Sequence, residues 1–215
     1  MEIVFQGAVS IDDFATAKAH ISDWDLIIEG YARYLNIHKE DFEIIQIIKA
    51  SPAKWKIKIR PENAVIILEL INAIITLLAT LSSSEQNLKQ LKSSELFSSA
   101  ADIEYIQKKE AELETLTHQR IAEIVADHAA SKNNTDNESQ GFLRRGLIKQ
   151  YEFINNGGVV NVYINSSEDE ALQESARVAN DHQREIQKLK DSIQTLRLMT
   201  KTEQENSGSP DLSSL

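Results

Sequence analysis

The residues best suited to chemistry in this chain are its histidines and its many carboxylates. The five histidines are His20, His38, His118, His128 and His182. No two of them are four residues apart, and none follows a glutamate by three residues, the spacings that place zinc or di-iron ligands on one helix face. His118 and His128, which have carboxylates near them, would form a site only if their helix met another element that carries ligands. The carboxylates in question are Glu114, Glu123 and Asp127. We therefore predict no metal site, no cofactor and no catalytic residue.

Motifs for phosphate binding and nucleophilic catalysis do not occur in the sequence. Gly157 and Gly158 lie between a predicted helix and a predicted strand, but no Gly-Lys-Ser/Thr follows them, so they are typical of a helix end and a turn. The cluster Ser207-Gly208-Ser209 lies in a polar segment and not between a strand and a helix, as a nucleophile elbow requires. These observations favour an interaction protein over an enzyme. An enzyme whose catalytic residues form no readable motif is the third alternative.

Composition and charge restrict the class of partner. The 215 residues carry a formal net charge of −10, which argues against general nucleic-acid binding because that depends on clustered Lys and Arg. Cysteine is absent, which excludes disulfides and thiolate chemistry and fits a reducing compartment. The N-terminus carries Glu2 where a secretory signal would carry basic residues. We predict a cytoplasmic protein, with the inner face of the cytoplasmic membrane as the alternative.

A basic alternating segment precedes an apolar one. Residues 54–60 alternate base and hydrophobe, which predicts a strand with Trp55, Ile57 and Ile59 on one face. The other face would carry four possible anion contacts, namely Lys54, Lys56, Lys58 and Arg60. The alternative is an edge strand whose lysines prevent aggregation, a common device in natural sheets.

Residues 64–81 are predicted to form a helix that is apolar around most of its circumference. Eleven of these eighteen residues are Val, Ile or Leu, and such a helix must be covered by protein or by lipid. Its polar residues Glu69, Asn72, Thr76 and Thr80 fall on one narrow stripe. Either the helix is a core helix with this stripe facing water, or it enters a membrane. The residues predicted to make its contacts are Ile67, Leu70, Ile71, Ile74 and Leu78.

A heptad pattern predicts a long C-terminal helix. Its seam consists of Leu172, Ser175, Ala179, His182, Ile186, Leu189, Ile193 and Leu196, with spacings of three and four throughout. The second half of this seam, from Ile186 to Leu196, is typical of a coiled coil, whereas the first half is weak. Two interpretations remain open: the seam mediates self-association, or it packs on Ile121, Ile124 and Val125 of the same chain.

The predicted fold class is α+β. A small N-terminal β-α-β-β-α unit (1–83), which ends in the apolar helix 64–81, precedes a mainly helical region with one short strand and the long heptad helix. The predicted divisions are a helical region at 84–131, a linker or mobile loop at 132–139, a helix-strand-helix module at 140–201 and a disordered tail at 202–215. Ser82–Ser84 are expected to form a loop.

These features predict a non-enzymatic interaction or assembly protein, such as an adapter or an oligomeric subunit. It would associate with itself or with a protein partner through the apolar helix and the heptad helix. The alternative is a membrane-associated effector, in which helix 64–81 enters the bilayer and the basic strand lies on anionic lipid.

Overall fold

The computed structural model describes residues 2–6, 14–38, 42–48, 54–58, 61–93, 99–156, 158–163, 173–174, 176–185 and 188. The strands are β1 (Glu2–Gln6), β2 (Glu43–Ile48), β3 (Lys54–Lys58) and β4 (Val159–Tyr163). The helices are α1 (Phe14–Leu35), α2 (Pro61–Ser93), α3 (Ala100–Ser131) and α4 (Asn137–Asn155). Residues 173–174, 176–185 and 188 are also helical.

The four strands form one antiparallel sheet in the order β2-β3-β1-β4. Strand β3 is internal, since Lys56 lies opposite Val4 of β1 on one side and Gln46 of β2 on the other. The interpretation of the basic segment as a guarded edge strand is therefore wrong. The edges are β2 and β4. The alternation of base and hydrophobe could not show this, because it describes the two faces of a strand and not its neighbours in the sheet.

The helices begin where the sequence supplies capping groups. The side chain of Ser99 accepts a hydrogen bond from the backbone N–H of Asp102, whose own carboxylate accepts one from the backbone N–H of Ser99, so the two residues form a capping box for α3. The carboxylate of Asp136 caps α4 by accepting from the N–H of Glu138. Helix α4 thus begins inside the segment 132–139.

Helix α2 is continuous through Ser82–Ser84, where a loop was expected. The Ser82 hydroxyl donates to the carbonyl of Ala79 and the Thr80 hydroxyl donates to the carbonyl of Thr76. These local bonds satisfy the hydroxyls within the helix, so the serines do not break it. The loop prediction is wrong, and α2 runs ten residues past the predicted boundary at residue 83.

The core is built around the first half of α2. Its side chains Ile67, Leu68, Leu70, Ile71, Ile74, Ile75 and Leu78 are at most 2% exposed. Three residues of the polar stripe, Glu69, Thr76 and Thr80, are exposed, whereas Asn72 is half-buried and its side-chain oxygen is buried. This burial favours the interpretation of α2 as a core helix with a polar edge, and the membrane interpretation stays the alternative.

Helices α1 and α4 cross closely at two glycines. A Cβ added at Gly30 would lie 2.9 Å from the carbonyl oxygen of Phe142, and one added at Gly146 would lie 3.1 Å from the carbonyl oxygen of Leu26. Next to this crossing, one residue after Gly30 on α1 and four residues after Gly146 on α4, the buried Tyr31 hydroxyl donates to Oε1 of Gln150 at 2.6 Å. The contact fixes α4 against α1.

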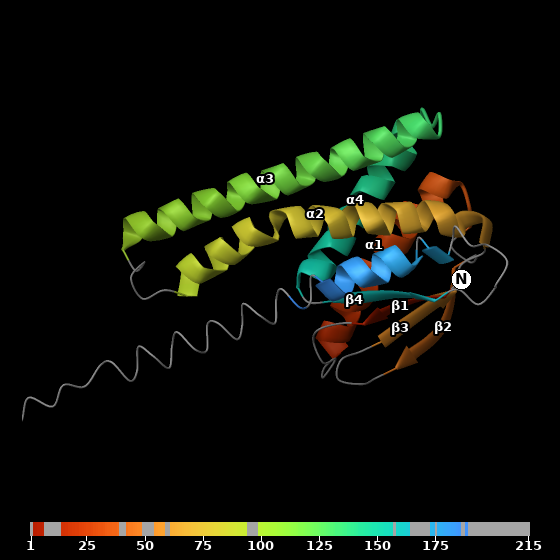
Figure 1. Ribbon diagram of the computed structural model, residues 1–215, viewed down its shortest axis with the longest axis horizontal. Coiled ribbons are helices and arrows are strands. Elements are labelled where there is room, and N and C mark those ends of the chain that lie inside the picture. The colour runs from red at the N-terminus through yellow and green to blue at the C-terminus, as the bar shows by residue number, and fades with distance from the viewer. Residues whose placement is uncertain are drawn as a thin grey trace, which may run out of the picture.

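Helices α2 and α3 form a long antiparallel pair whose connected ends project beyond the sheet (Figure 1). We call this projection the α2–α3 arm and define it as residues 85–93 of α2 and 100–117 of α3. An ion pair between Lys92 and Glu110 joins its two helices. The last turns of α4 reach the base of the arm, where Tyr151 bonds to Glu85.

The predicted fold class is wrong. Helices of 22, 33, 32 and 19 residues outweigh strands of five and six residues, so the protein is mainly helical. Its strands do not form a self-contained N-terminal unit followed by a helical region. Strand β1 pairs on one side with β4, which lies more than 150 residues later in the chain. Local sequence patterns cannot predict such a pairing, because they contain no information about distant partners.

Candidate functional site

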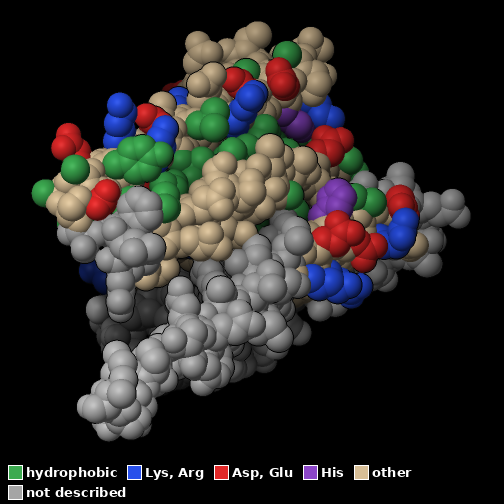
Figure 2. Space-filling model, turned by 60° about the vertical axis from the view of Figure 1, so that its left-hand side comes forward, with side chains coloured by type: hydrophobic (Ala, Val, Ile, Leu, Met, Phe, Trp, Pro, Cys, Tyr) green, Lys and Arg blue, Asp and Glu red, His purple; other side chains and the backbone are tan. Residues whose placement is uncertain are grey.

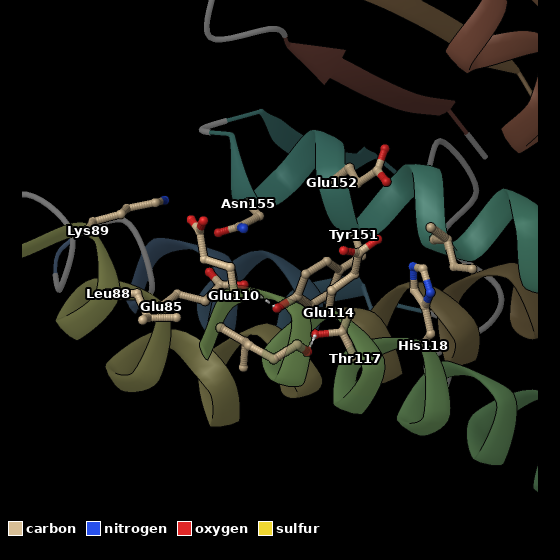
Figure 3. A pocket seen from close by; sticks show the side chains of 12 residues that line it. Glu85, Leu88, Lys89, Glu110, Glu114, Thr117, His118, Tyr151, Glu152 and Asn155 are labelled. Atoms are coloured by element: carbon tan, nitrogen blue, oxygen red, sulfur yellow. Dashed lines mark hydrogen bonds between the residues drawn. The ribbon is translucent and has the colours of Figure 1, made fainter. Parts of the chain in front are cut away.

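The arm carries a groove at its base, between α2, α3 and α4, with a volume of about 260 Å³ (Figure 3). Its lining comprises Glu85, Leu88 and Lys89 of α2, Glu110, Leu113, Glu114, Thr117 and His118 of α3, and Ile148, Tyr151, Glu152 and Asn155 of α4. We call it the acidic groove, since four carboxylates line it against one lysine. The leucines and Ile148 give it an apolar floor.

Helical spacing explains how each helix contributes to the groove. Glu110, Glu114 and His118 are four residues apart on α3, which places them on one face of that helix. Tyr151 and Asn155 have the same spacing on α4. The side chains therefore converge because three helices meet, and not because the sequence places them together.

Tyr151 is the most buried polar side chain of the groove. It is 5% exposed, and its hydroxyl donates to Oε1 of Glu85 at 2.6 Å. Burial raises the pKa of Tyr151 above its usual value, and the hydrogen bond to Glu85 and the charge of Glu85 raise this pKa further. Tyr151 is therefore a neutral donor at physiological pH and holds the Glu85 carboxylate in place.

The carboxylates of the groove differ in whether a lysine forms an ion pair with them. Glu110 is ion-paired with Lys92, and Glu152 with Lys149 at 2.8 Å, an interaction that raises the pKa of Lys149. Glu85, by contrast, accepts a hydrogen bond from a neutral tyrosine. Glu114 has no ion-pair or hydrogen-bond partner among the described residues. Within the part of the chain that the structure describes, two carboxylates of the groove, Glu85 and Glu114, therefore have no ion pair.

A second hollow of about 340 Å³ lies on the other side of the arm. It is lined by Ser84, Asn87, Leu88, Leu91, Tyr105, Lys109, Glu112, Leu113 and Leu116. Leu88 and Leu113 line both hollows, so a single layer of side chains separates them. Tyr105 is 49% exposed and Leu116 37% exposed. Figure 2 shows hydrophobic side chains bordered by acidic and basic ones on this projecting side of the molecule.

His118 and His128, which the sequence places on one helix, have separate roles. His118 lines the acidic groove, whereas His128 lies between Tyr34 of α1 and Glu69 of α2. In the Nε2–H tautomer, the Tyr34 hydroxyl donates to Nδ1 at 2.8 Å and Nε2–H donates to Glu69 at 3.2 Å. Burial raises the pKa of Tyr34. No group of three His, Asp or Glu side chains that could hold a metal ion occurs within the described parts of the chain.

The residues predicted from the sequence to make contacts do not meet at this groove. Ile67, Leu70, Ile71, Ile74 and Leu78 are at most 2% exposed and pack inside the chain's own core. The heptad residues Ile186, Leu189, Ile193 and Leu196 lie outside the described residues. Lys54, Lys56 and Lys58 lie on the internal strand β3, and Arg60 is outside the described residues.

The sequence predicts a site at Glu114 and His118 only on the condition that another element meets their helix. That element is α4, together with the second half of α2. The local signal was the repeated acidic residue at four-residue spacing on α3. It was not sufficient, because such spacing is also typical of a solvated helix face.

Comparison of the chain with protein-family models, curated proteins and solved structures finds no match.

Proposed function

We propose that this protein is a non-enzymatic interaction protein, of the adapter class, whose acidic groove binds a basic amphipathic segment of a protein partner. The observation that supports this proposal is the pair of carboxylates without an ion pair, Glu85 and Glu114, beside the apolar floor of a projecting arm. An amphipathic helix with apolar residues on one face and Lys or Arg beside them is complementary to this arrangement.

The chemistry of the groove supports binding over catalysis. Its buried hydroxyl, Tyr151, has a raised pKa and donates a hydrogen bond to Glu85, so this hydroxyl keeps its proton near neutral pH. The other lining side chains include three carboxylates and the apolar residues Leu88, Leu113 and Ile148. The groove therefore supplies fixed charge and apolar surface, the two properties that a docking site needs.

Self-association remains a prediction. The five apolar residues of helix 64–81 on which it partly rested are enclosed in the core, so α2 does not present them to a second copy. The heptad seam from Ile186 to Leu196 is the part of that prediction that we retain. We propose a cytoplasmic location, which the absence of cysteine supports.

Membrane association is the second candidate, because α2 contains one stretch, Val65–Ser93, that is long and apolar enough to cross a bilayer. Its most apolar window is 50% buried inside this chain, and a single helix of this length and composition is weak support. In that alternative the protein would lie on the inner face of the cytoplasmic membrane, with Lys54, Lys56, Lys58 and Arg60 near anionic lipid.

Fluorescence anisotropy with a labelled Leu/Lys amphipathic peptide tests the groove. We expect the wild-type protein to bind this peptide and not its Leu/Glu counterpart. Glu114→Gln should weaken binding by about two- to fivefold, the range for one exposed charge pair. The matched control is Glu104→Gln, which removes an exposed carboxylate of the same helix that does not line the groove.

Two results would contradict the proposal. The first is equal binding of the Leu/Lys and Leu/Glu peptides, because the groove would then make no use of its charge. The second is an equal effect of Glu114→Gln and Glu104→Gln, which would indicate attraction to the net charge of the whole protein.

A further inference from the structure

We propose that Arg33 of α1 and Arg145 of α4, both held against the ring of Phe142, form a second binding site, which takes the phosphate group of a phosphorylated side chain in a partner protein. The site lies at the crossing of α1 and α4 and shares no residue with the acidic groove. The proposal is therefore independent of the function proposed for that groove.

Both arginines contact the same aromatic ring. The guanidinium carbon Cζ of Arg145 lies 4.4 Å from the centroid of the Phe142 ring, and Cζ of Arg33 lies 4.9 Å from it. Both distances are those of a cation–π contact. Arg145 follows Phe142 by three residues on one face of α4, whereas Arg33 reaches the ring from α1. One ring thus brings together two cationic groups that are far apart in the sequence.

The close crossing of the two helices fixes the position of this ring. A Cβ added at Gly30 would lie 2.9 Å from the carbonyl oxygen of Phe142, so the backbones touch at the residue that carries the ring. Arg33 follows Gly30 by three residues and therefore lies on the neighbouring turn of the same face of α1. Because the backbone on both sides is fixed, the two arginines are preorganised, and preorganisation lowers the entropic cost of binding.

Most hydrogen-bond donors of the two arginines are not used within the described part of the chain. Arg145 has neither an ion pair nor a hydrogen bond with another described residue. Arg33 forms one ion pair, in which Nε lies 3.7 Å from Oε1 of Glu29, a distance too long for a hydrogen bond. Both side chains are exposed. Since a guanidinium group has five N–H donors in one plane, each arginine can contact the ring and still donate to a ligand.

A phosphate monoester matches this pair in charge and in hydrogen bonding. A phosphorylated side chain carries about −1.5 to −2 charges at pH 7 and three acceptor oxygens, so one phosphate can compensate two guanidinium groups. Arginine binds phosphate with two parallel hydrogen bonds, and clusters of arginine are a recurring means of recognising phosphorylated segments. The carboxylate of an ordinary acidic side chain carries only one charge. The pair therefore favours a phosphate over a carboxylate.

The surroundings of the pair favour a phosphorylated segment over a phospholipid bilayer. Binding to an anionic bilayer requires several bases spread over one face of a protein. Asp136 and Glu138, at the start of α4 and within six residues of Phe142, are exposed carboxylates, and the chain has a net charge of −10. Such a surface repels a broad anionic plane and also the phosphate backbone of a nucleic acid. A single phosphate on a flexible segment meets only the two arginines.

Titration of the isotope-labelled full-length protein with a Gly/Ser peptide that contains one phosphoserine tests the site by nuclear magnetic resonance. We expect this peptide to shift the Nε–H signals of Arg33 and Arg145. The same peptide with serine in place of phosphoserine should leave the signals unchanged, and the peptide with glutamate there should bind less tightly. Inorganic phosphate should compete with the phosphopeptide, because the arginines contact the phosphate group itself.

Substitutions at the pair measure what each group contributes. Arg145→Gln should weaken binding of the phosphopeptide about fivefold, the upper end of the range for an exposed charge pair, since the phosphate carries more than one charge. Arg145→Lys should weaken it as well, because lysine keeps the charge and loses the planar donors. Phe142→Leu should weaken it about two- to fivefold, as expected for loss of an exposed cation–π contact.

Arg144→Gln is the matched control. It removes the same charge from the preceding exposed position of α4, which makes no cation–π contact with Phe142 in the described structure. Binding should therefore change less than twofold. Far-ultraviolet circular dichroism shows whether each variant is folded. If Phe142→Leu does not fold, Arg145→Lys still tests the site, because Arg145 is exposed.

Several results would overturn the proposal. Absence of phosphopeptide binding, or equal binding of the phosphoserine and glutamate peptides, would show that the pair does not recognise phosphate. Equal effects of Arg144→Gln and Arg145→Gln would indicate attraction to surface charge alone, and unchanged binding in Arg145→Lys would exclude a role for the guanidinium group. Co-sedimentation with phosphatidic acid vesicles that is lost in Arg145→Gln would assign the site to a membrane.

The two binding sites can be tested separately. Glu114→Gln in the acidic groove should leave phosphopeptide binding unchanged, and Arg145→Gln should leave binding of the Leu/Lys peptide unchanged. If either substitution weakens binding at the other site, the sites are not independent and the proposal of a separate phosphate site is wrong. If the phosphopeptide fails to bind while the Leu/Lys peptide still depends on Glu114, only the phosphate site is refuted.

Discussion

Replacing Gly30 by alanine would place a methyl group inside the crossing of α1 and α4. The new Cβ would lie 2.9 Å from the carbonyl oxygen of Phe142, 3.1 Å from the Cα of Gly146 and 3.4 Å from the Cα of Leu143. All three are backbone atoms, so no side chain can rotate away. The two helices would have to separate, and the tightly packed interior on both sides opposes this movement.

The magnitude follows from two opposing terms. Alanine in a helix interior stabilises the folded chain by about 1 kcal/mol relative to glycine. Overpacking of a well-packed contact costs about 1–3 kcal/mol. Gly141→Ala provides the matched control, because a Cβ on Gly141 of α4 would meet nothing within 4 Å. The free energy of unfolding should therefore be lower for Gly30→Ala than for Gly141→Ala by about 1–3 kcal/mol, since the propensity term cancels in this difference.

Denaturant unfolding followed by far-ultraviolet circular dichroism measures both variants. Gly146→Ala should also be less stable than Gly141→Ala, since its Cβ would lie 3.1 Å from the carbonyl oxygen of Leu26. Equal stabilisation by Gly30→Ala and Gly141→Ala would show that α1 and α4 do not cross this closely. That result would refute the packing on which the position of α4, and hence of the groove, depends.

Two further predictions concern α2 and the buried tyrosines. Ile74→Asp should lower the free energy of unfolding by several kcal/mol because it buries an unpaired charge at a fully enclosed position. Thr76→Asp, on the exposed stripe, should lower it only slightly. An equal loss of stability for both variants in thermal melts would contradict a water-facing stripe and favour the membrane alternative. Burial raises the pKa of Tyr31 and of Tyr151, so above the usual tyrosine pKa of about 10 the unfolded chain loses these protons before the folded one does. The contribution of the two neutral tyrosines to the stability of the folded protein is therefore complete below about pH 10 and is lost as the pH rises further. The urea midpoint of unfolding should fall over this range, and it should fall less steeply in Tyr151→Phe. Midpoints that do not depend on pH in this range would be inconsistent with buried, neutral tyrosines.

Much of the local structure could be predicted from the sequence, because its causes are local. The apolar run around Ile67–Leu78 demands cover, and the structure buries it. The stripe that contains Glu69 and Thr76 faces outward, as its helical spacing predicts. These properties follow from residue type and helical period alone.

The expected N-terminal β-α-β-β-α unit was wrong because strand pairing depends on distant contacts. The residues of β4 carry no mark of their pairing with β1, nor does the basic pattern of β3 show that two strands flank it. Ser82–Ser84 resemble a loop in sequence but lie within α2, where the Ser82 hydroxyl is satisfied by the carbonyl of Ala79. For the strands, pairing with distant partners outweighs what the local pattern can show.

The sequence by itself determined that this chain is acidic, free of cysteine and rich in helix-forming segments. It also determined that the apolar side chains of α2 must be covered by other groups. Only the tertiary structure decided where function can lie. Glu85, Glu114 and Tyr151 are separated by dozens of residues in the chain and become one site only where α2, α3 and α4 meet. The physical reason is that helical period orients a side chain on its own helix, whereas its neighbours are set by the packing of helices far apart in the sequence.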